Sequence, residues 1–379
     1  MVHKHHVTLI FNNLVVQILY NLQCWDYLNH NALSQNIIVW VRKFSAGGLR
    51  FPLEMAFHIL LGLFFQVMLN QTSVTEFLLL GVTDIQVLQP VLFVIFLAIY
   101  IVNVAGNAAI LMVVISDPRL HSPMYFFLGN LSCLDICFST VTMPKMLENF
   151  LSTHRAISFL GCISQLHFFH FMGSTESMLL TVMGFDRFVA ICKPLHYTHN
   201  ESSVCIQMAV TVWIFGFFHA LLHSVMTSHL NFCGSNHINH FFCDVKPLLE
   251  LACGNTELNQ WLLNTVTGTI AMGSCFLTFL SYFYIIIYLF FKTHSCSMLH
   301  KALSTCASHF LVVVLFFVPV VFVYIHPASS SSMDQDQINA IMYNVVTPVL
   351  NPLIYTLRNK EVKGALRRVI SRSQWLEEV

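Results

Sequence analysis

Charged side chains are scarce in this chain. Asp, Glu, Lys and Arg together make up 9% of the 379 residues, whereas about 25% is usual for a soluble domain. The hydrophobic fraction is 56%, and the mean hydropathy is +0.68. A soluble protein needs a covering of charge to keep that much apolar surface dispersed. The composition therefore excludes an ordinary soluble protein and indicates that lipid is the solvent.

Several signals of other functions are absent. The formal net charge is zero, so no broad basic surface favours nucleic acid. We find no repeat of 20–50 residues that would indicate a solenoid or a propeller. No His-Glu-x-x-His or Gly-x-Ser-x-Gly motif occurs, which argues against an intramembrane enzyme. A transporter, a remote alternative, would be expected to show duplicated halves, and none is visible.

The chain does contain seven long apolar segments. A helix needs about 20 mainly apolar residues to cross a bilayer, and in lipid its backbone hydrogen bonds must close within the segment. Only Asp135 and Glu176 interrupt the segments with an acidic or basic side chain. We therefore predict an all-α membrane protein, a seven-transmembrane helix bundle within 91–357. The segments are 91–115, 124–144, 162–182, 206–226, 261–291, 302–325 and 338–357.

Lysine and arginine in the connections predict the orientation, because they favour the cytoplasmic side. The tail 358–379 is basic, and it alternates basic and apolar residues, which is typical of a short amphipathic eighth helix on the inner membrane surface. The external segment 68–90 and the long connection 228–262 carry mainly acids. The N-terminus is therefore expected outside. The basic side carries Arg119, Arg187, Lys193, Lys292, Lys301, Arg358, Lys360, Lys363, Arg367, Arg368 and Arg372.

Residues 1–67 do not resemble the rest of the chain. They are mixed in composition, and we expect an atypical N-terminal extension that is disordered or dispensable. Either Met1 or Met68 is then the natural start. Of the three Asn-x-Ser/Thr sequences, only Asn70 falls outside the membrane on the external side, so glycosylation is expected there.

Four cysteines lie on the external side. Cys162 begins the third apolar segment, and Cys233, Cys243 and Cys253 follow at equal spacing in the long external connection. Four cysteines in an oxidising compartment suit two disulfides. The spacing leaves all three pairings open.

An adjacent acid and base, Asp186 and Arg187, stand at the end of the third apolar segment. The stretch reads Met183-Gly184-Phe185-Asp186-Arg187-Phe188-Val189-Ala190-Ile191-Cys192-Lys193-Pro194-Leu195-His196-Tyr197. Such a pair at a membrane boundary is costly unless the arginine has a function. A membrane signalling receptor is therefore the first hypothesis, and a basic anchor on the cytoplasmic side is the alternative.

That stretch belongs to a series of motifs in a fixed order. The others are Thr75-Glu76-Phe77-Leu78-Leu79-Leu80-Gly81, Gly106-Asn107, Leu120-His121-Ser122-Pro123-Met124-Tyr125, Leu131-Ser132-Cys133-Leu134-Asp135, Ser281-Tyr282, Lys301-Ala302-Leu303-Ser304-Thr305-Cys306-Ala307-Ser308-His309, Pro348-Val349-Leu350-Asn351-Pro352-Leu353-Ile354-Tyr355 and Arg358-Asn359-Lys360-Glu361-Val362-Lys363. From about 68 to 370 the chain resembles a vertebrate olfactory receptor, in the rhodopsin-like class of G-protein-coupled receptors. The resemblance implies a multi-pass protein of the plasma membrane that binds a small volatile ligand. It also implies activation of a heterotrimeric stimulatory G protein, which raises cyclic AMP.

The resemblance has departures. Phe185, Phe188 and Phe317 stand where the family usually has tyrosine, and the loop 198–203 differs from the usual sequence. Lost hydroxyl groups and an altered loop favour two alternatives, a poorly coupled receptor or a non-olfactory chemosensory receptor.

The resemblance implies a switch at the cytoplasmic end. Asp186 is expected to hold Arg187 at rest, and Arg187 to turn toward Tyr282 or Tyr355 on activation. Prolines 348 and 352 free carbonyl groups of the last helix, so Asn351, Pro352 and Tyr355 are expected on a moving element.

Two carboxylates inside the spans, Asp135 and Glu176, are expected to face the bundle interior. With Asn107, Asn351 and Ser174 they form an oxygen-rich set that suits a sodium ion, and the resemblance supports such a site. The alternative is one protonated acid hydrogen-bonded to the other, because neighbouring carboxylates raise each other's pKa.

The ligand pocket is expected between the outer halves of spans three, five, six and seven. The candidate residues are mostly aromatic, and no carboxylate among them suits an amine, so a small, neutral and fairly apolar ligand is expected. They are His167, Phe169, His170, Gly173, Ser174, Phe322 and Tyr324.

For the disulfides, the resemblance implies Cys162–Cys243 and Cys233–Cys253. The sequence His240-Phe241-Phe242-Cys243-Asp244 also resembles a metal-binding pattern. A disulfide at Cys243 removes the thiolate that such a site needs, so no metal site is expected.

Overall fold

The computed structural model describes residues 74–83, 85–193, 201–292, 296–325, 333–359 and 361–368. The chain divides into two units, Met1–Asn70 and Gln71–Val379, and every described residue belongs to the second. The predictions for 1–67 and for Asn70 therefore lie outside the described residues. So does most of the loop 198–203.

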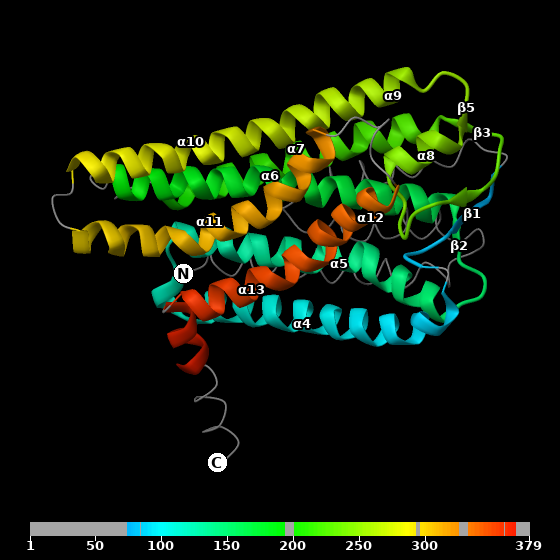
Figure 1. The fold of residues 1–379 in the computed structure, drawn as a ribbon. Coiled ribbons are helices and arrows are strands. Elements are labelled where there is room, and N and C mark those ends of the chain that lie inside the picture. Colours follow the sequence, from blue (N-terminus) through cyan, green and yellow to red (C-terminus); the bar gives the residue numbers. More distant parts are fainter. Residues whose placement is uncertain are drawn as a thin grey trace, which may run out of the picture. The chain divides into compact units, whose positions relative to one another are not determined.

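All seven predicted segments are helical (Figure 1). Most of the helices extend beyond the predicted apolar segments, because a helix continues into the polar ends that lie outside the hydrocarbon. The first four are α4 (Gln89–Ser116), α5 (Pro123–Leu151), α6 (Phe159–Cys192) and α7 (Glu201–Ser228). The fifth combines α9 (Glu257–Leu262), a π-helical turn η5 (Leu263–Thr267) and α10 (Gly268–Lys292). The sixth is α11 (Cys296–Ile325), and the seventh combines α12 (Met333–Ile341), a π-helical turn η6 (Met342–Val346) and α13 (Thr347–Arg358).

Length and composition alone identify fewer membrane spans in the described residues. Four helices are long and apolar enough, namely Gln86–Ser116, Pro123–Leu151, Ser203–Ser228 and Glu257–Lys292, and a fifth is reached by joining Gln337–Thr356 to Glu361–Arg368. The helix α6 is long enough, but histidine, serine and glutamine side chains along it reduce its apolar character. Its polar side chains are buried by neighbouring helices, so α6 crosses the membrane inside the bundle.

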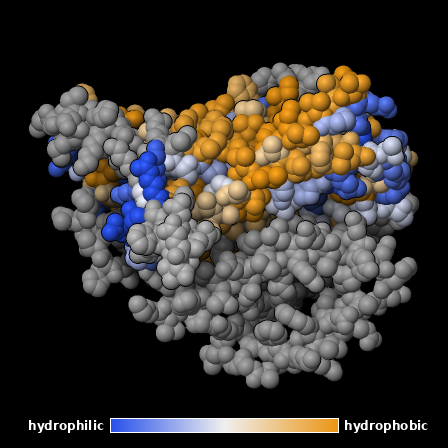
Figure 2. Space-filling model, turned by 90° about the horizontal axis from the view of Figure 1, so that it is seen from below, coloured by the Kyte–Doolittle hydropathy of each residue, from blue (hydrophilic) through white to orange (hydrophobic). Residues whose placement is uncertain are grey.

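The helix α6 lies at the centre of the described bundle, in contact with α5, α7, α10 and α11. Most of the side chains of α5 and α6 are buried, whereas α4 exposes many apolar side chains. Figure 2 shows apolar residues gathered over the middle of one face and hydrophilic residues toward its ends. An apolar band between polar ends is the surface that a bilayer requires.

Small sheets cover the end of the bundle that the sequence predicts to be external, called the external end below. The strand β1 (Glu76–Leu79) pairs antiparallel with β2 (Ala156–Ser158) and parallel with β4 (His237–Ile238). The strands β3 (Asn231–Phe232) and β5 (Ala252–Cys253) form an antiparallel pair, and a short helix α8 (Val245–Leu251) lies between β4 and β5 in the chain. Phe77 of β1 is fully buried against Phe159 and Phe232. The external segment is thus attached to the loops by backbone pairing and an aromatic contact.

The seventh helix packs closely on α4. A Cβ atom added at Gly106 would lie 3.1 Å from the Cβ and Cγ atoms of Pro352, so the missing side chain allows this approach. Asn107, the next residue, donates a 3.2 Å hydrogen bond to the carbonyl oxygen of Pro348. The prolines of α13 therefore lie at a helix contact, where a polar side chain of α4 satisfies a backbone carbonyl.

A further helix, Glu361–Arg368, follows α13 after a sharp bend. Its Val362 and Ala365 are fully buried, which gives it one apolar face. Tyr125 of α5 donates a 2.6 Å hydrogen bond to Glu361, and Arg368 pairs with Asp117 at 2.6 Å. The hydrogen bonds from Arg368 and the Arg119 backbone lower the pKa of Asp117 below its ordinary value.

Candidate functional site

The end of α6 that the sequence predicts to be cytoplasmic holds the predicted acid–base pair. Arg187 donates to Oδ2 of Asp186 through Nε, at 3.1 Å, and through Nη2. The side chains of both are largely buried, with 12% of Arg187 and 4% of Asp186 exposed. The structure thus brings together the two residues that were expected to pair.

The two tyrosines expected near Arg187 are both buried. The hydroxyl of Tyr282 on α10 makes a 2.5 Å hydrogen bond with Nδ1 of His309 on α11. The hydroxyl of Tyr355 on α13 has no hydrogen-bond partner among the described residues. His309 lies in one of the motifs that carry the family resemblance, and its bond to Tyr282 was not predicted.

An apolar cluster surrounds this end of the bundle. Tyr282, Ile285, Leu289 and Cys306 form its buried part. Phe188, one of the three phenylalanines that depart from the family pattern, packs against it. Phe188 therefore keeps the packing role of an aromatic side chain, without the hydroxyl of tyrosine.

The intramembrane carboxylates lie in one polar region. Asp135 of α5 and Glu176 of α6 are 0% and 1% exposed, and they are close enough to interact electrostatically. Asn351 of α13 donates to both carboxylate oxygens of Asp135, at 3.0 and 3.1 Å. Three helices therefore meet through these side chains.

Several oxygen atoms in this region lack a hydrogen-bond partner within the described part of the chain. They are Oε1 and Oε2 of Glu176, Oδ1 of Asn107 and Oδ1 of Asn351. Ser174 differs, because its hydroxyl donates to the carbonyl oxygen of His170 at 2.7 Å. The set is rich in acceptors, which is the property that a sodium ion requires.

The predicted ligand residues of α6 have different surroundings. His167 is fully buried and makes a 3.1 Å hydrogen bond with Ser224 of α7, so it belongs to the contact between α6 and α7. Phe169 packs on Phe242 of the external loop and on Tyr343 of η6. A Cβ atom added at Gly173 would lie 3.5 Å from Phe138, so this position offers no open space.

The predicted residues of α11 are less informative. Phe322 is 53% exposed, so neighbouring side chains do not enclose it. The side chain of Tyr324 lies outside the described residues. The structure therefore places Phe169 and His170 under the external loop, against Phe242 and Asp244.

Sequence reasoning missed a cluster of imidazole rings beside His170. The ring of His170 stacks on that of His223 with centroids 5.2 Å apart, and the ring of His219 lies 4.8 Å from that of His223. The Nε2 atom of His219 and the Nε2 atom of His223 each lie 2.9 Å from the hydroxyl of Thr267 in η5. The spacing of four residues between His219 and His223 was visible in an otherwise apolar segment and is the signal that could have found them. This cluster adds α7 to the predicted pocket walls.

The external loop is fixed over these residues. Disulfides join Cys162 to Cys243 and Cys233 to Cys253, with Cα atoms 5.3 and 5.9 Å apart. Next to Cys243, Asp244 pairs with Nε2 of His170 at 3.1 Å. Burial raises the pKa of Asp244, but the hydrogen bond and the electrostatic interaction with His170, together with the electrostatic interaction with His240, outweigh it and hold this pKa below its ordinary value.

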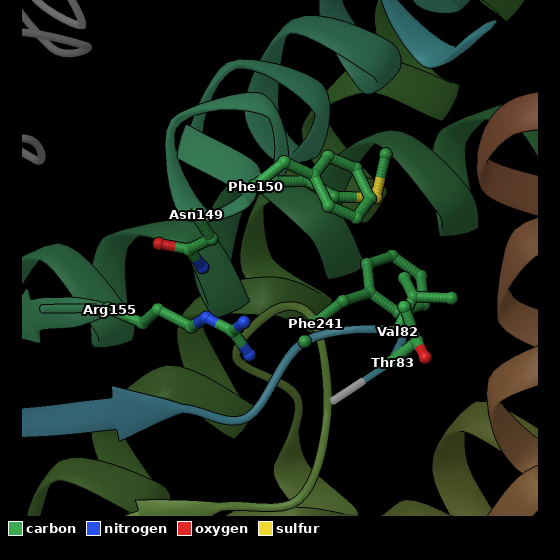
Figure 3. Close-up of a pocket in the computed structure, with 8 residues that line it drawn as sticks. Val82, Thr83, Asn149, Phe150, Arg155 and Phe241 are labelled. Atoms are coloured by element: carbon green, nitrogen blue, oxygen red, sulfur yellow. The ribbon is translucent and has the colours of Figure 1, made fainter. Parts of the chain in front are cut away.

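A small pocket lies elsewhere under the external loops (Figure 3). Asn149 and Arg155 line one side, with Phe241, Val82 and Thr83 opposite. Both amide atoms of the buried Asn149 lack a hydrogen-bond partner from the described residues. The pocket has room for about one water molecule, so it suits a structural water rather than an organic ligand.

Comparison with known proteins gives one consistent result. The family of proteins described as "Olfactory receptor" matches residues 96–373. Human olfactory receptor 12D1 is 78% identical over 313 residues, which are 82% of this chain and 98% of that protein. Human olfactory receptor 12D2 is 79% identical over 306 residues, 80% of this chain and 100% of that protein. Mouse olfactory receptor 4E2 is 47% identical over 305 residues, 80% of this chain and 98% of that protein.

Proposed function

Because the chain belongs to the olfactory receptor family, we propose that it binds a small, mostly apolar odorant and activates a stimulatory G protein, which raises cyclic AMP. Members of this family are G-protein-coupled receptors with seven membrane spans in the plasma membrane, and they are not enzymes. The observation that carries the proposal is the pairing of Asp186 with Arg187 at the cytoplasmic end of α6.

Arg187 acts as the switch in this proposal. Its guanidinium group stays charged at any physiological pH and can bind two partners in turn. In the described arrangement Asp186 holds it, and the hydroxyl of Tyr282 is taken by His309. Activation frees Arg187 from Asp186, and Tyr282 and Tyr355 are its new partners beside the G protein. Both tyrosines are close enough to Arg187 for its charge to act on them.

The odorant site lies under the disulfide-bonded loop, against Phe169 and His170. The aromatic rings there favour an apolar ligand, and the imidazole groups offer it a few hydrogen bonds. An odorant that binds the active arrangement better shifts the equilibrium toward it. The hydroxyl of Ser174 is taken by the carbonyl oxygen of His170, so Ser174 and Gly173 shape the wall rather than bind the ligand by hydrogen bonds.

A sodium ion between Asp135 and Glu176 stabilises the resting arrangement in this proposal. The unpartnered oxygen atoms of Glu176, Asn107 and Asn351 support it. On activation, movement of α13 carries Asn351 away from Asp135 and weakens the site. The external N-terminus, the glycan at Asn70 and a membrane-surface position of the helix Glu361–Arg368 complete the proposed arrangement.

The decisive test measures cyclic AMP in cells that express the chain from Met1 or from Met68, against a panel of odorants. An odorant that raises cyclic AMP in the wild type should give only background signal with Arg187→Ala. Alanine removes the guanidinium group that pairs with Asp186 at rest and with the tyrosines on activation. Surface staining must be equal for the two proteins. A response that survives Arg187→Ala would contradict the proposed switch.

Silence of the wild type despite verified surface expression would point to the poorly coupled alternative. The variants Phe185→Tyr and Phe188→Tyr restore the hydroxyl groups of the family pattern. A response regained with them would assign the weakness to these positions.

A further inference from the structure

Asn344 of η6 differs from most other buried asparagines in the described part of the chain. Its side chain is 0% exposed, and neither Oδ1 nor Nδ2 has a hydrogen-bond partner among the described residues. Asn103, Asn130 and Asn351 are also buried, yet each donates at least one side-chain hydrogen bond. Asn149 shares the property of Asn344, but it lines the water-sized pocket of the external loops. A buried amide without partners destabilises a folded protein, so Asn344 requires an explanation.

The π-helical turn η6 places Asn344 inside the bundle. This turn contacts α5 and α11. The preceding residue, Tyr343, packs on Phe169 of α6 with ring centroids 6.0 Å apart. Because Asn344 has no exposed surface, its amide faces the bundle interior rather than lipid. Single π-helical turns inside α-helices are frequent at functional sites.

The rings beside this turn form an aromatic wall. Phe169 also packs on Phe138 of α5 and on Phe242 of the external loop, with centroids 5.3 and 4.7 Å apart. Three parts of the chain thus bring rings together next to η6. Ligand sites combine such apolar walls with a small number of polar groups. Asn344 supplies one polar group from the seventh helix.

Asn344 is separate from the region of the intramembrane carboxylates. Asn351, which donates to Asp135, follows seven positions later, about 10 Å along the helix axis. The amide of Asn344 therefore lies between that region and the aromatic wall under the loop. A small molecule with an apolar body and one polar end matches this arrangement.

We propose that Asn344 selects odorants whose neutral polar end both donates and accepts a hydrogen bond, an alcohol being the simplest case; this inference rests on the proposed odorant-binding function. Nδ2 is a donor and Oδ1 an acceptor, so a hydroxyl group suits both atoms. An ether or an aldehyde offers only an acceptor and leaves Oδ1 unpaired. A charged end would have to be buried without an opposite charge, which is costly.

The test measures odorant binding directly, without the G protein. Thermal unfolding of the purified full-length receptor in lipid nanodiscs is followed with straight-chain primary alcohols from hexanol to nonanol, and with the methyl ethers and aldehydes of the same chains. A site built to bind a hydroxyl group rejects analogues that lack it. In the wild type, at least one alcohol should stabilise the receptor at a concentration roughly tenfold or more below that of its ether and aldehyde.

Asn344→Leu keeps the approximate size of the side chain and removes both polar atoms. This variant should bind the alcohol and the ether equally. Without any odorant it should unfold at the same temperature as the wild type or at a higher one, because a shape-preserving apolar replacement of an unpaired polar group costs little. Asn344→Ser keeps a donor and an acceptor, so it should retain a preference for alcohols.

Asn130→Leu is the matched control. Asn130 donates to the carbonyl oxygen of Phe126 at 2.9 Å and accepts from Nε1 of Trp213 at 3.2 Å. Its replacement should lower the unfolding temperature and leave the alcohol preference unchanged. The two leucine variants thus separate an asparagine that selects a ligand from one that holds helices together.

Three results would overturn the proposal. The wild type could fail to distinguish any alcohol from its ether, which would mean that water alone binds Asn344. The preference could persist in Asn344→Leu, or that variant could unfold at a much lower temperature, as expected for a purely structural asparagine. A cyclic AMP response to other odorants would leave the proposed function intact in each case. Alcohol-selective binding without any cyclic AMP signal would instead support the role of Asn344 and contradict coupling.

Discussion

Asp135 and Glu176 are the residues whose chemistry is easiest to test. If Glu176 binds sodium, replacing choline with sodium should stabilise the purified receptor, by about 1.4 kcal/mol when sodium is at ten times its Kd. Glu176→Gln keeps the shape of the side chain but removes its charge, so this sodium effect should disappear. Thermal unfolding in the two salts is the measurement.

Glu148→Gln is the matched control for this experiment. Glu148 lies near the external end of α5 with 57% of its side chain exposed, and it pairs with Lys145 at 2.9 Å. Its loss should leave the sodium effect intact. If instead Asp135 and Glu176 share a proton, the wild type would unfold at the same temperature in sodium and in choline.

At this scale, the sequence indicates a candidate residue only where the residue carries its own chemical signal. Asp186 and Arg187 are neighbours in the chain, and the intramembrane acids stand out in apolar segments. The cluster around Thr267 was not predicted, because no sequence pattern identifies the hydrogen-bond partner of a serine, threonine or histidine in a membrane helix. The π-helical turn η5 sets the direction of Thr267, and the sequence 263–267 does not reveal that turn.

The contact between α6 and α7 depends on a missing side chain. A Cβ atom added at Gly216 would lie 2.1 Å from Oγ1 of Thr175 and 3.1 Å from the carbonyl oxygen of Phe171. Gly216→Ala should therefore destabilise the receptor by about 1–3 kcal/mol, the usual cost of overpacking. The temperature of thermal unfolding and the surface expression should both fall.

Gly129 of α5 provides the matched glycine. Its added Cβ atom would meet Val114 at 3.6 Å, an ordinary contact, so Gly129→Ala should be tolerated. Both substitutions gain the same helix propensity, which isolates the packing effect. Thr175→Ala should partly rescue Gly216→Ala. Equal stability of the two alanine variants would mean that α6 and α7 move apart at little cost.

The elements were predictable to different degrees. Seven apolar segments of 20 or more residues leave few alternatives to helices, because lipid forbids unpaired backbone groups. The sheets at the external end were not predicted. Their strands have two to four residues, which is too short for an alternating pattern, and β1 pairs with β4 across a separation that no local signal encodes.

The whole molecule has two chemically different ends, and α6 connects them. Cys162 is disulfide-bonded near one end of this helix, and Arg187 stands 25 positions later at the other. At 1.5 Å per residue these positions are about 37 Å apart along the axis, more than the roughly 30 Å of a hydrocarbon core. The disulfide-bonded loops and the Asp186–Arg187 pair must therefore lie on opposite sides of the membrane.

The direction of insertion can be tested on living cells. Disulfides form in oxidising compartments, and lysine and arginine favour the cytoplasmic side, so both arguments predict that the N-terminal segment lies outside. An epitope tag inserted before Met68 should be stained on intact cells, whereas a tag after Val379 should be stained only after permeabilisation. Staining of the C-terminal tag on intact cells would reverse the orientation. Arg187 would then face away from the G protein, and the proposed signalling could not operate.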